Sequence, residues 1–258
     1  MIALRSLLFN IAFYINLIVL MVLGLPAMLG GRAGVFFMAR LWGETSLWLL
    51  EKICALRVEF RGLENIPQGG YIIGSKHQSF LESFAMLRHA PDFSFILKRD
   101  LMFIPLFGLY LVVGKQIGIN RASGRAALNE MIEKASAALR GGRQIFIYPE
   151  GTRRPPGAPA QYKFGIVALY EASGAPILPV AINTGLYWGR RGFLRMPGTA
   201  IIEYLPIVAP GLGRAEAVAE LSDRIEAASD ALNRAAIAHD PTLGARMVSE
   251  ANGEQAAR

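Results

Sequence analysis

The strongest constraint in this sequence is a long apolar segment near the N-terminus that carries no charged residue between Arg5 and Arg32. Its centre is the run LIVLMVL at 17–23. A helix of this length can cross the hydrocarbon core of a bilayer, and the segment is longer than the apolar part of a signal peptide. Pro26 is expected to kink or end the helix. The chain is therefore predicted to begin with a membrane-embedded helix.

A second, more amphipathic helix is expected over 35–56, with Trp42 and Trp48 suited to the membrane–water boundary. Two arrangements fit this pair: one spanning helix plus an amphipathic helix, or a two-helix hairpin embedded in one leaflet. The length of the uncharged run disfavours a buried pair of core helices. The flanking charges are too balanced to fix an orientation. Residues 1–56 are therefore predicted to form a membrane anchor, and the sequence does not decide between the two arrangements.

The charged residues favour phosphate-bearing or membrane partners. There are 27 Lys and Arg against 20 Asp and Glu, a formal charge of +7, and only six of the cations are lysines. Arginine contacts phosphate with two hydrogen bonds, which suits phosphorylated substrates and anionic membranes. The sequence shows no zinc-ligand spacing, RNA-binding sheet signature or basic recognition helix, so no nucleic-acid partner is expected. With one cysteine, Cys54, no internal disulfide can form, and no metal or cofactor is predicted.

From about residue 57 the sequence alternates between strand-like and helix-like segments. Strands are expected at 56–60, 71–74, 93–97, 116–121, 144–148, 177–182 and 199–204. Helices are expected at 79–88, within 101–113, and at 124–140, 164–172 and 215–237, with a loop at 185–198. This alternation predicts one α/β domain over 57–240, a mixed, mostly parallel sheet flanked by helices. The polar tail 241–258 is expected to fray.

Polar side chains of the kinds that take part in catalysis and phosphate binding follow the strands of this domain. His77 comes after the strand at 71–74, Arg121 after the strand at 116–121, and the segment EGTR at 150–153 after the strand at 144–148. Ligand sites of open α/β sheets lie outside the carboxyl ends of the strands. The clustering therefore predicts a single site at that edge.

His77 and Glu82 form a candidate base and orienting acid. If a helix begins at Ser79, the imidazole can fold back toward the carboxylate in the first turn. The same Ser79-x-x-Glu82 spacing is a capping box, so Glu82 can instead serve only as a helix cap. The sequence has no G-x-S-x-G elbow, and Cys54 lies in an apolar helix. With no protein nucleophile in view, the histidine would activate a substrate hydroxyl directly.

The segment Glu150-Gly151-Thr152-Arg153 has the features of a phosphate cradle. Glycine lets backbone amides approach an anion, threonine adds a hydroxyl donor, and arginine binds phosphate with two bonds. Glu150 cannot itself favour phosphate and is better suited to anchoring an arginine. An ordinary polar turn is the alternative interpretation.

Four segments in order resemble the conserved blocks of the glycerolipid acyltransferases. They are HQSFLE at 77–82, INR at 119–121, YPEGTR at 148–153 and ILPV at 177–180. The resemblance is closest to the 1-acyl-sn-glycerol-3-phosphate O-acyltransferases, also called lysophosphatidic acid acyltransferases, and covers about 57–204. It also implies N-terminal membrane helices.

The resemblance implies His77 as general base and Glu82 as its partner, although the family more often has aspartate at the second position. It assigns the acceptor's phosphate to Arg121, Glu150, Gly151, Thr152 and Arg153, with Lys98 at the same site. Pro179, in the fourth block, is implied in donor binding or in shaping the site. No cofactor is implied.

The implied reaction moves a fatty acyl group from an acyl thioester to the sn-2 hydroxyl of 1-acylglycerol-3-phosphate, giving phosphatidate without an acyl-enzyme. The donor can be acyl-CoA or acyl carrier protein, and Arg190, Arg191 and Arg195 can receive an acidic carrier or simply face solvent or membrane. Alternatives are another lysophospholipid or lyso-aminolipid acceptor, or an inactive lipid-binding protein. The expected location is a bacterial inner membrane with the domain on its cytoplasmic face.

Overall fold

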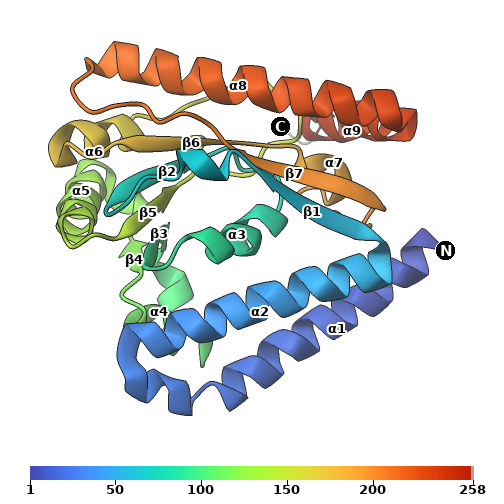
Figure 1. Cartoon of the computed structure of the whole chain (residues 1–258), viewed down its shortest axis with the longest axis horizontal. Helices are drawn as coiled ribbons and strands as arrows, with labels where there is room; N and C mark the ends of the chain where they lie inside the picture. Colours follow the sequence, from blue (N-terminus) through green and yellow to red (C-terminus); the bar gives the residue numbers. More distant parts are fainter. Residues whose placement is uncertain (257–258) are drawn as a thin grey trace.

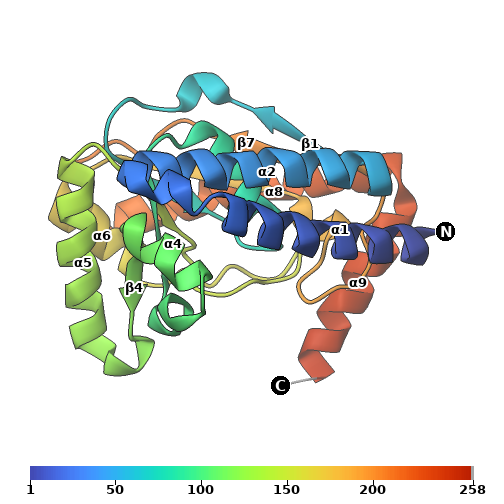
Figure 2. The same cartoon turned by 90° about the horizontal axis from the view of Figure 1, so that it is seen from below.

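The computed structural model describes the backbone of residues 1–256 and the side chains of residues 1–120 and 122–248. It begins with two antiparallel helices, α1 (Ile2–Leu23) and α2 (Gly31–Cys54), which lie side by side (Figures 1 and 2). The short 3₁₀ helix η1 (Pro26–Gly30) joins them, and Pro26 occupies its first position, as expected for a residue that ends α1. Among the described residues α1 is the one helix whose length and composition allow it to cross a membrane.

A seven-stranded sheet follows, in the order β1-β7-β6-β2-β5-β3-β4. The strands are β1 (Leu56–Arg61), β2 (Tyr71–Ser75), β3 (Phe93–Lys98), β4 (Ile117–Ile119), β5 (Gln144–Ile147), β6 (Ile177–Ile182) and β7 (Gly198–Tyr204). Every neighbouring pair is parallel except β6 with β7. The predicted mixed, mostly parallel α/β sheet is confirmed.

Helices cover both faces of the sheet (Figure 1). The longer ones are α5 (Gly124–Arg140), α6 (Gly165–Ser173), α8 (Arg214–His239) and α9 (Pro241–Ala256), and the shorter ones are α3 (Leu81–Ala85), α4 (Phe107–Val113) and α7 (Thr184–Tyr187). Further 3₁₀ turns are η2 (Leu63–Asn65), η3 (Met86–His89), η4 (Arg99–Phe103) and η5 (Arg121–Ser123).

The two faces of the sheet bury separate apolar cores because successive side chains of a strand point to opposite sides. On one face, Ile73 of β2 packs in a core that includes residues of α1, α2 and α3. On the other face, Ile72 packs with residues of α5, α6 and α8. The N-terminal helices therefore contribute to the same core as the sheet.

Three segments differ from the sequence-based expectation. The strand at 116–121 ends earlier, at Ile119, because the Asn120 side chain accepts a hydrogen bond from the Ala122 N–H and starts a 3₁₀ turn. The loop at 185–198 opens with the short helix α7. Most of the tail predicted at 241–258 forms α9, whose first turn is anchored by the buried Leu243, and residues 257–258 lie outside the described residues.

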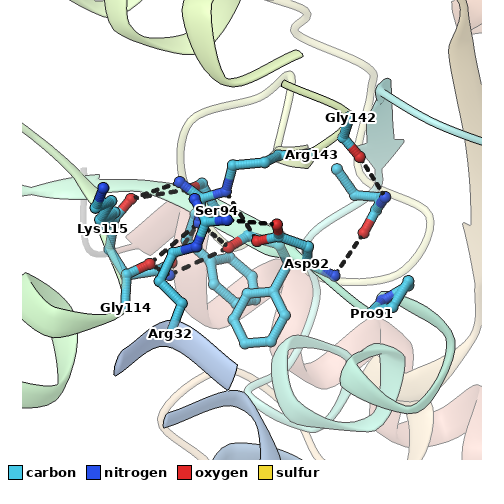
Figure 3. A network of polar contacts seen from close by, with 12 residues as sticks. Arg32, Pro91, Asp92, Ser94, Gly114, Lys115, Gly142 and Arg143 are labelled. Carbon is cyan, nitrogen blue, oxygen red and sulfur yellow. Dashed lines mark hydrogen bonds and ion pairs between the residues drawn. The ribbon is translucent and has the colours of Figure 1, made fainter. Parts of the chain in front are cut away.

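A buried arginine ties the N-terminal hairpin to the sheet (Figure 3). Arg143 lies just before β5, and its guanidinium donates to the Asp92 carboxylate at 3.0 Å and to the backbone oxygens of Phe93 and Gly114 at 2.7 and 3.1 Å. Arg32 in the first turn of α2 donates to the other oxygen of Asp92 at 3.0 Å. Burial lowers the pKa of Arg143, while Asp92 opposes the shift.

We expect Arg143→Met to destabilise the protein by about 3 kcal/mol, because buried backbone carbonyl groups of Phe93 and Gly114 would lose a charged donor and Asp92 would lose one of its two arginines. Urea unfolding in detergent measures this free energy. The control is Arg57→Met, whose exposed ion pair with Glu51 should contribute about 0.5 kcal/mol or less. Equal losses for the two variants would contradict the structural role of Arg143.

Candidate active site

The sheet order brings the predicted site residues together at one edge. β2, β5, β3 and β4 are neighbours in that order and run parallel, so the residues that follow them lie side by side. These residues are His77 after β2, Arg153 after β5 and Lys98 at the end of β3. Arg121 begins η5 directly after β4, but its side chain lies outside the described residues.

His77 is positioned by a carboxylate and an aromatic ring. Its Nδ1 lies 2.8 Å from Oε1 of Glu82, and its ring stacks on Tyr148 with centroids 3.8 Å apart and planes 16° apart. The His77 side chain is 14% exposed and lines the large cleft of the molecule. The pair predicted from the sequence is therefore in direct contact.

Glu82 is fully buried, and each of its oxygens accepts hydrogen bonds. Oε1 accepts from the backbone N–H groups of Gln78 at 3.0 Å and Ser79 at 2.8 Å. Oε2 accepts from the Thr184 hydroxyl at 2.7 Å. An ionised carboxylate only accepts, so His77 Nδ1 carries the proton toward Glu82 and Nε2 is left as the acceptor.

The helix-capping and orienting roles of Glu82 coexist. Its bond to the Ser79 N–H is one half of a capping box. The other half is absent, since the Ser79 hydroxyl accepts instead from the Leu81 N–H at 3.1 Å, where α3 begins. One carboxylate thus starts the helix and orients the histidine.

The loop after β5 is joined to the catalytic stretch through its backbone. The Arg154 N–H donates to the His77 carbonyl at 2.8 Å. Gly151 has a φ of 68°, a conformation that favours glycine, and its N–H donates to the Tyr148 carbonyl at 2.9 Å. The arrangement fixes Thr152 and Arg153 in the wall of the cleft.

Two further cleft residues were missed by sequence reasoning. The Lys163 amine lies so close to Gly151 that a Cβ there would be 3.1 Å from Nζ. Tyr148 stacks on His77 and donates its hydroxyl to Ser83 at 3.0 Å. Burial, reinforced by the negative charge of Glu82, raises the pKa of Tyr148, so the phenol stays neutral. Only the position of Tyr148 within YPEGTR signalled it; nothing marked Lys163.

Glu150 lies behind the loop rather than in the cleft. It is buried, and its Oε1 is 3.6 Å from Nε of Arg154, so it anchors an arginine as its chemistry suggested. Nearby, the buried Lys76 pairs with Glu226 of α8, whose other oxygen accepts from the Tyr162 hydroxyl at 3.0 Å. Burial raises the pKa of Glu150, with the charge of Lys76 opposing the shift.

The remaining predicted residues occupy different places. Lys98 lines the cleft and forms an ion pair with Asp100 on an exposed turn. Pro179 lies in the middle of the sheet, opposite Gly74, and is not among the residues lining the cleft. Its carbonyl accepts from the Leu205 N–H at 2.9 Å. The structure brings His77, Lys98 and 151–153 to one cavity but leaves Pro179 outside it.

The cleft has a volume of about 1590 Å³ and is largely apolar. Along one side it follows α1 from Asn10 to Met21, and α4 contributes Tyr110 and Leu111. The Tyr110 hydroxyl donates to the Met21 carbonyl at 2.8 Å and so holds α4 against α1. A cavity of this size and character suits long acyl chains beside a polar head. No His, Cys, Asp and Glu cluster able to hold a metal occurs within the described part of the chain.

Comparison with known proteins agrees with this geometry. A family model described as Acyltransferase matches residues 57–183. A 1-acyl-sn-glycerol-3-phosphate acyltransferase of Pseudomonas aeruginosa is 38% identical over 197 residues, which cover 76% of both chains. A chloroplastic enzyme of the same name from Arabidopsis thaliana is 29% identical over 74% of this chain and 54% of its own length.

Among solved structures, the 1-acyl-sn-glycerophosphate acyltransferase PlsC from Thermotoga maritima matches with a TM-score of 0.75 and 25% identity, covering 90% of this chain and 98% of that one. The fold and site define a lipid acyltransferase. The chain belongs to the 1-acyl-sn-glycerol-3-phosphate acyltransferase family of acyltransferases. With its apolar N-terminal helix, the protein is membrane-associated.

The raised pKa of Glu150 gives a pH-dependent stability. In the folded protein the Glu150 carboxyl keeps its proton above pH 4.5, its ordinary pKa. The contribution of this group to the free energy of unfolding is therefore fully present below pH 4.5 and is lost as pH rises through the folded-state pKa. We therefore expect the unfolding free energy of wild type, relative to Glu150→Gln, to fall as pH rises from 4.5. Urea titrations at several pH values measure it.

The matched control for that series is Glu64→Gln, which removes a carboxylate from the exposed turn η2. The difference in unfolding free energy between this variant and wild type should vary less with pH than the difference for Glu150→Gln, because the Glu64 side chain remains hydrated in the folded protein. A difference between wild type and Glu150→Gln that stays constant across the series would contradict the assignment of Glu150 as a desolvated carboxyl.

Proposed function

We propose that the protein transfers a fatty acyl group from an acyl thioester to the sn-2 hydroxyl of 1-acylglycerol-3-phosphate and so produces phosphatidate. One observation carries this proposal. The His77–Glu82 pair, 2.8 Å apart, faces a largely apolar cleft whose wall also holds the cations Lys98, Arg153 and Lys163. A base, a phosphate site and room for acyl chains are thus combined in one cavity.

His77 acts as general base on the acceptor. Nε2 takes the proton of the sn-2 hydroxyl while its oxygen attacks the thioester carbonyl, and Glu82 stabilises the imidazolium that forms. The tetrahedral intermediate then collapses, the C–S bond breaks, and the leaving thiolate receives the proton from His77. The products are the new ester and the free thiol.

The direct transfer is supported by the state of the single cysteine and of the serines close to His77. Ser79 and Cys54 are both buried. Burial raises the pKa of the Cys54 thiol to about 11, so little thiolate is present at neutral pH. The Ser83 hydroxyl accepts from Tyr148. These residues offer no activated nucleophile for an acyl-enzyme.

The cationic wall provides the acceptor's phosphate site. Arg153, Lys98 and Lys163 line the cleft, and we place Arg121 with them because it follows β4 at the same edge of the sheet. Gly151 and Thr152 contribute a close backbone approach and a hydroxyl donor. Glu150 shapes this loop through Arg154, and Pro179 contributes to the shape of the sheet.

The N-terminal hairpin is the membrane anchor in this proposal. The outer side of α1 exposes Leu4, Leu8 and Ile15, while the rest of the helix lies against α2 and the cleft. A helix that lies along the domain in this way favours embedding of the hairpin in one leaflet over a simple span. We place the domain on the cytoplasmic face of a bacterial inner membrane, where an unpaired cysteine such as Cys54 stays reduced.

We expect purified protein in detergent to convert lysophosphatidate to phosphatidate with palmitoyl-CoA or palmitoyl carrier protein, and His77→Ala to abolish turnover. The alanine removes the imidazole that we assign as acceptor of the hydroxyl proton. His239→Ala, at the exposed end of α8, is the control and should retain full activity. Product formation is followed with a labelled acyl donor, with other lysophospholipids and a lyso-aminolipid as competing acceptors.

Equal turnover by wild type and His77→Ala would show that the histidine is not the base. Faster turnover of another acceptor would change the assigned substrate but not the assigned reaction, acyl transfer with His77 as base. Absence of turnover with every acceptor would favour a lipid-binding protein with an inactive site.

Glu82→Gln should lower kcat by about 10²- to 10⁴-fold, because an amide cannot stabilise the imidazolium as a carboxylate does. Stability should change little, since the amide oxygen can still accept from the N–H groups of Gln78 and Ser79, and the amide nitrogen can donate to Thr184. Stopped assays measure kcat, and unfolding measurements give the change in stability. Glu82→Asp, which keeps the charge, should lose less activity. Full kcat with lost stability would leave Glu82 as a cap only.

A further inference from the structure

The connection between β6 and β7 carries a pair of arginines on a tight turn beside the active site. Arg190 and Arg191 lie between Gly189 and Gly192, and the Gly192 N–H closes the turn on the Gly189 carbonyl at 3.0 Å. Both arginines line the cleft that holds His77. Arg191 has a φ of 59°, a left-handed conformation that is unusual for a side chain of this size. Nothing in the acceptor site described above uses this pair.

A buried third arginine holds the turn in place. Arg195 is only 6% exposed, and its guanidinium lies 3.9 Å from the centre of the Trp188 ring. It donates to the backbone oxygens of Gly192 and Phe193, each at 2.8 Å, and to Oδ1 of Asn10 in α1 at 2.7 Å. These partners are neutral, and together they hold the turn rigid.

The sheet places this turn on the other side of His77 from the acceptor's phosphate site. β2, which leads to His77, lies between β5 and β6 and is parallel to both. Arg153 and Lys98 follow β5 and β3 on one side, whereas α7 and the turn follow β6 on the other. The base therefore lies between two separate cationic groups.

Two anionic substrates meet at this base in the proposed reaction, which explains why one cationic group is not enough. An acyl thioester carried on phosphopantetheine has its phosphate at the far end of an extended arm. Cations that bind it must stand away from the reacting carbonyl, on a wall of the cleft. A donor phosphate and an acceptor phosphate would also repel each other if they shared one site.

We propose that Arg190 and Arg191 bind the phosphate of the phosphopantetheine arm of the acyl donor. The inference rests on the proposed acyl transfer and assigns the donor side of the same cleft. This phosphate is common to acyl-CoA and acyl carrier protein. The position of both side chains in the wall of the cleft favours a substrate phosphate over the headgroups of an anionic membrane.

The first test is kinetic and uses the double variant Arg190→Gln/Arg191→Gln. Its KM for palmitoyl-CoA and for palmitoyl carrier protein should rise about 10- to 100-fold, as expected for the loss of charge-assisted phosphate contacts. Its kcat and its KM for lysophosphatidate should stay within about twofold of wild type. The matched control is Arg57→Gln/Arg61→Gln, which removes two charges from the edge strand β1 and should change none of these constants.

The second test does not depend on turnover. Binding of S-hexadecyl-phosphopantetheine and of S-hexadecyl-pantetheine, which lacks the phosphate, is measured by calorimetry in detergent. Wild type should bind the phosphorylated probe more tightly, and the double variant should bind both equally. If wild type shows this phosphate preference but no acyl transfer, the proposed function fails while the phosphate site stands.

The kinetic arms also distinguish the sources of the phosphate. A higher KM of the double variant for both donors assigns the arginine pair to the phosphopantetheine phosphate that the donors share. A higher KM for palmitoyl-CoA alone would overturn that assignment in favour of the nucleotide phosphates of CoA. Unchanged KM for both donors overturns the proposal, as does a raised KM for lysophosphatidate alone. Weaker flotation of the double variant with phosphatidylglycerol vesicles, at unchanged donor KM, would overturn it in favour of a membrane contact.

Discussion

The candidate active site depends on one buried carboxylate. Glu82 is removed from water, which is costly for an ionised group unless hydrogen bonds replace its hydration. Its donors come from His77, from the two backbone amides that follow, and from Thr184, which lies 102 residues further along the chain. The contact with Thr184 forms where the segment after β6 lies beside the segment after β2, so the sheet completes the hydrogen bonding of this carboxylate.

This dependence explains how far the sequence could predict the site. The alternation of strands and helices predicted the sheet, and the contact between His77 and Glu82 follows from spacing within a single turn. The partner Thr184 leaves no local signal, because its contact with Glu82 is made through the tertiary fold. Sequence reasoning left both capping and orientation open for Glu82. The structure shows that one oxygen of Glu82 accepts from both the Ser79 amide and the imidazole, so the two contacts coexist.

The sequence is also silent on which cations are structural and which face the substrate. Of its 27 lysines and arginines, Lys76, Arg143 and Arg154 are buried in contacts with carboxylates, and Arg195 is buried among carbonyls and rings. Burial is what separates these residues from Lys98 and Arg153, and burial depends on distant parts of the chain. Glu150 illustrates the point, since it belongs to the phosphate-binding segment in the sequence but lies behind it in the fold. There, burial raises the pKa of Glu150 and Arg154 lies beside its carboxyl group, and both effects reduce the negative charge near the proposed phosphate site.

The N-terminal hairpin is joined to the catalytic chemistry in the same way. α1 forms a wall of the cleft, and it is held near its start by Arg195 through Asn10 and near its end by Tyr110 through Met21. α2 is held to the sheet by Arg32 and Asp92. In the proposed arrangement, the helix that faces the membrane on one side therefore faces the substrates on the other. A lysolipid that leaves the bilayer along α1 would enter the cleft without crossing water, which lowers the cost of presenting its acyl chain to the base. Membrane attachment and formation of the substrate cavity are thus one structural property of this chain, because the same helix surface provides both.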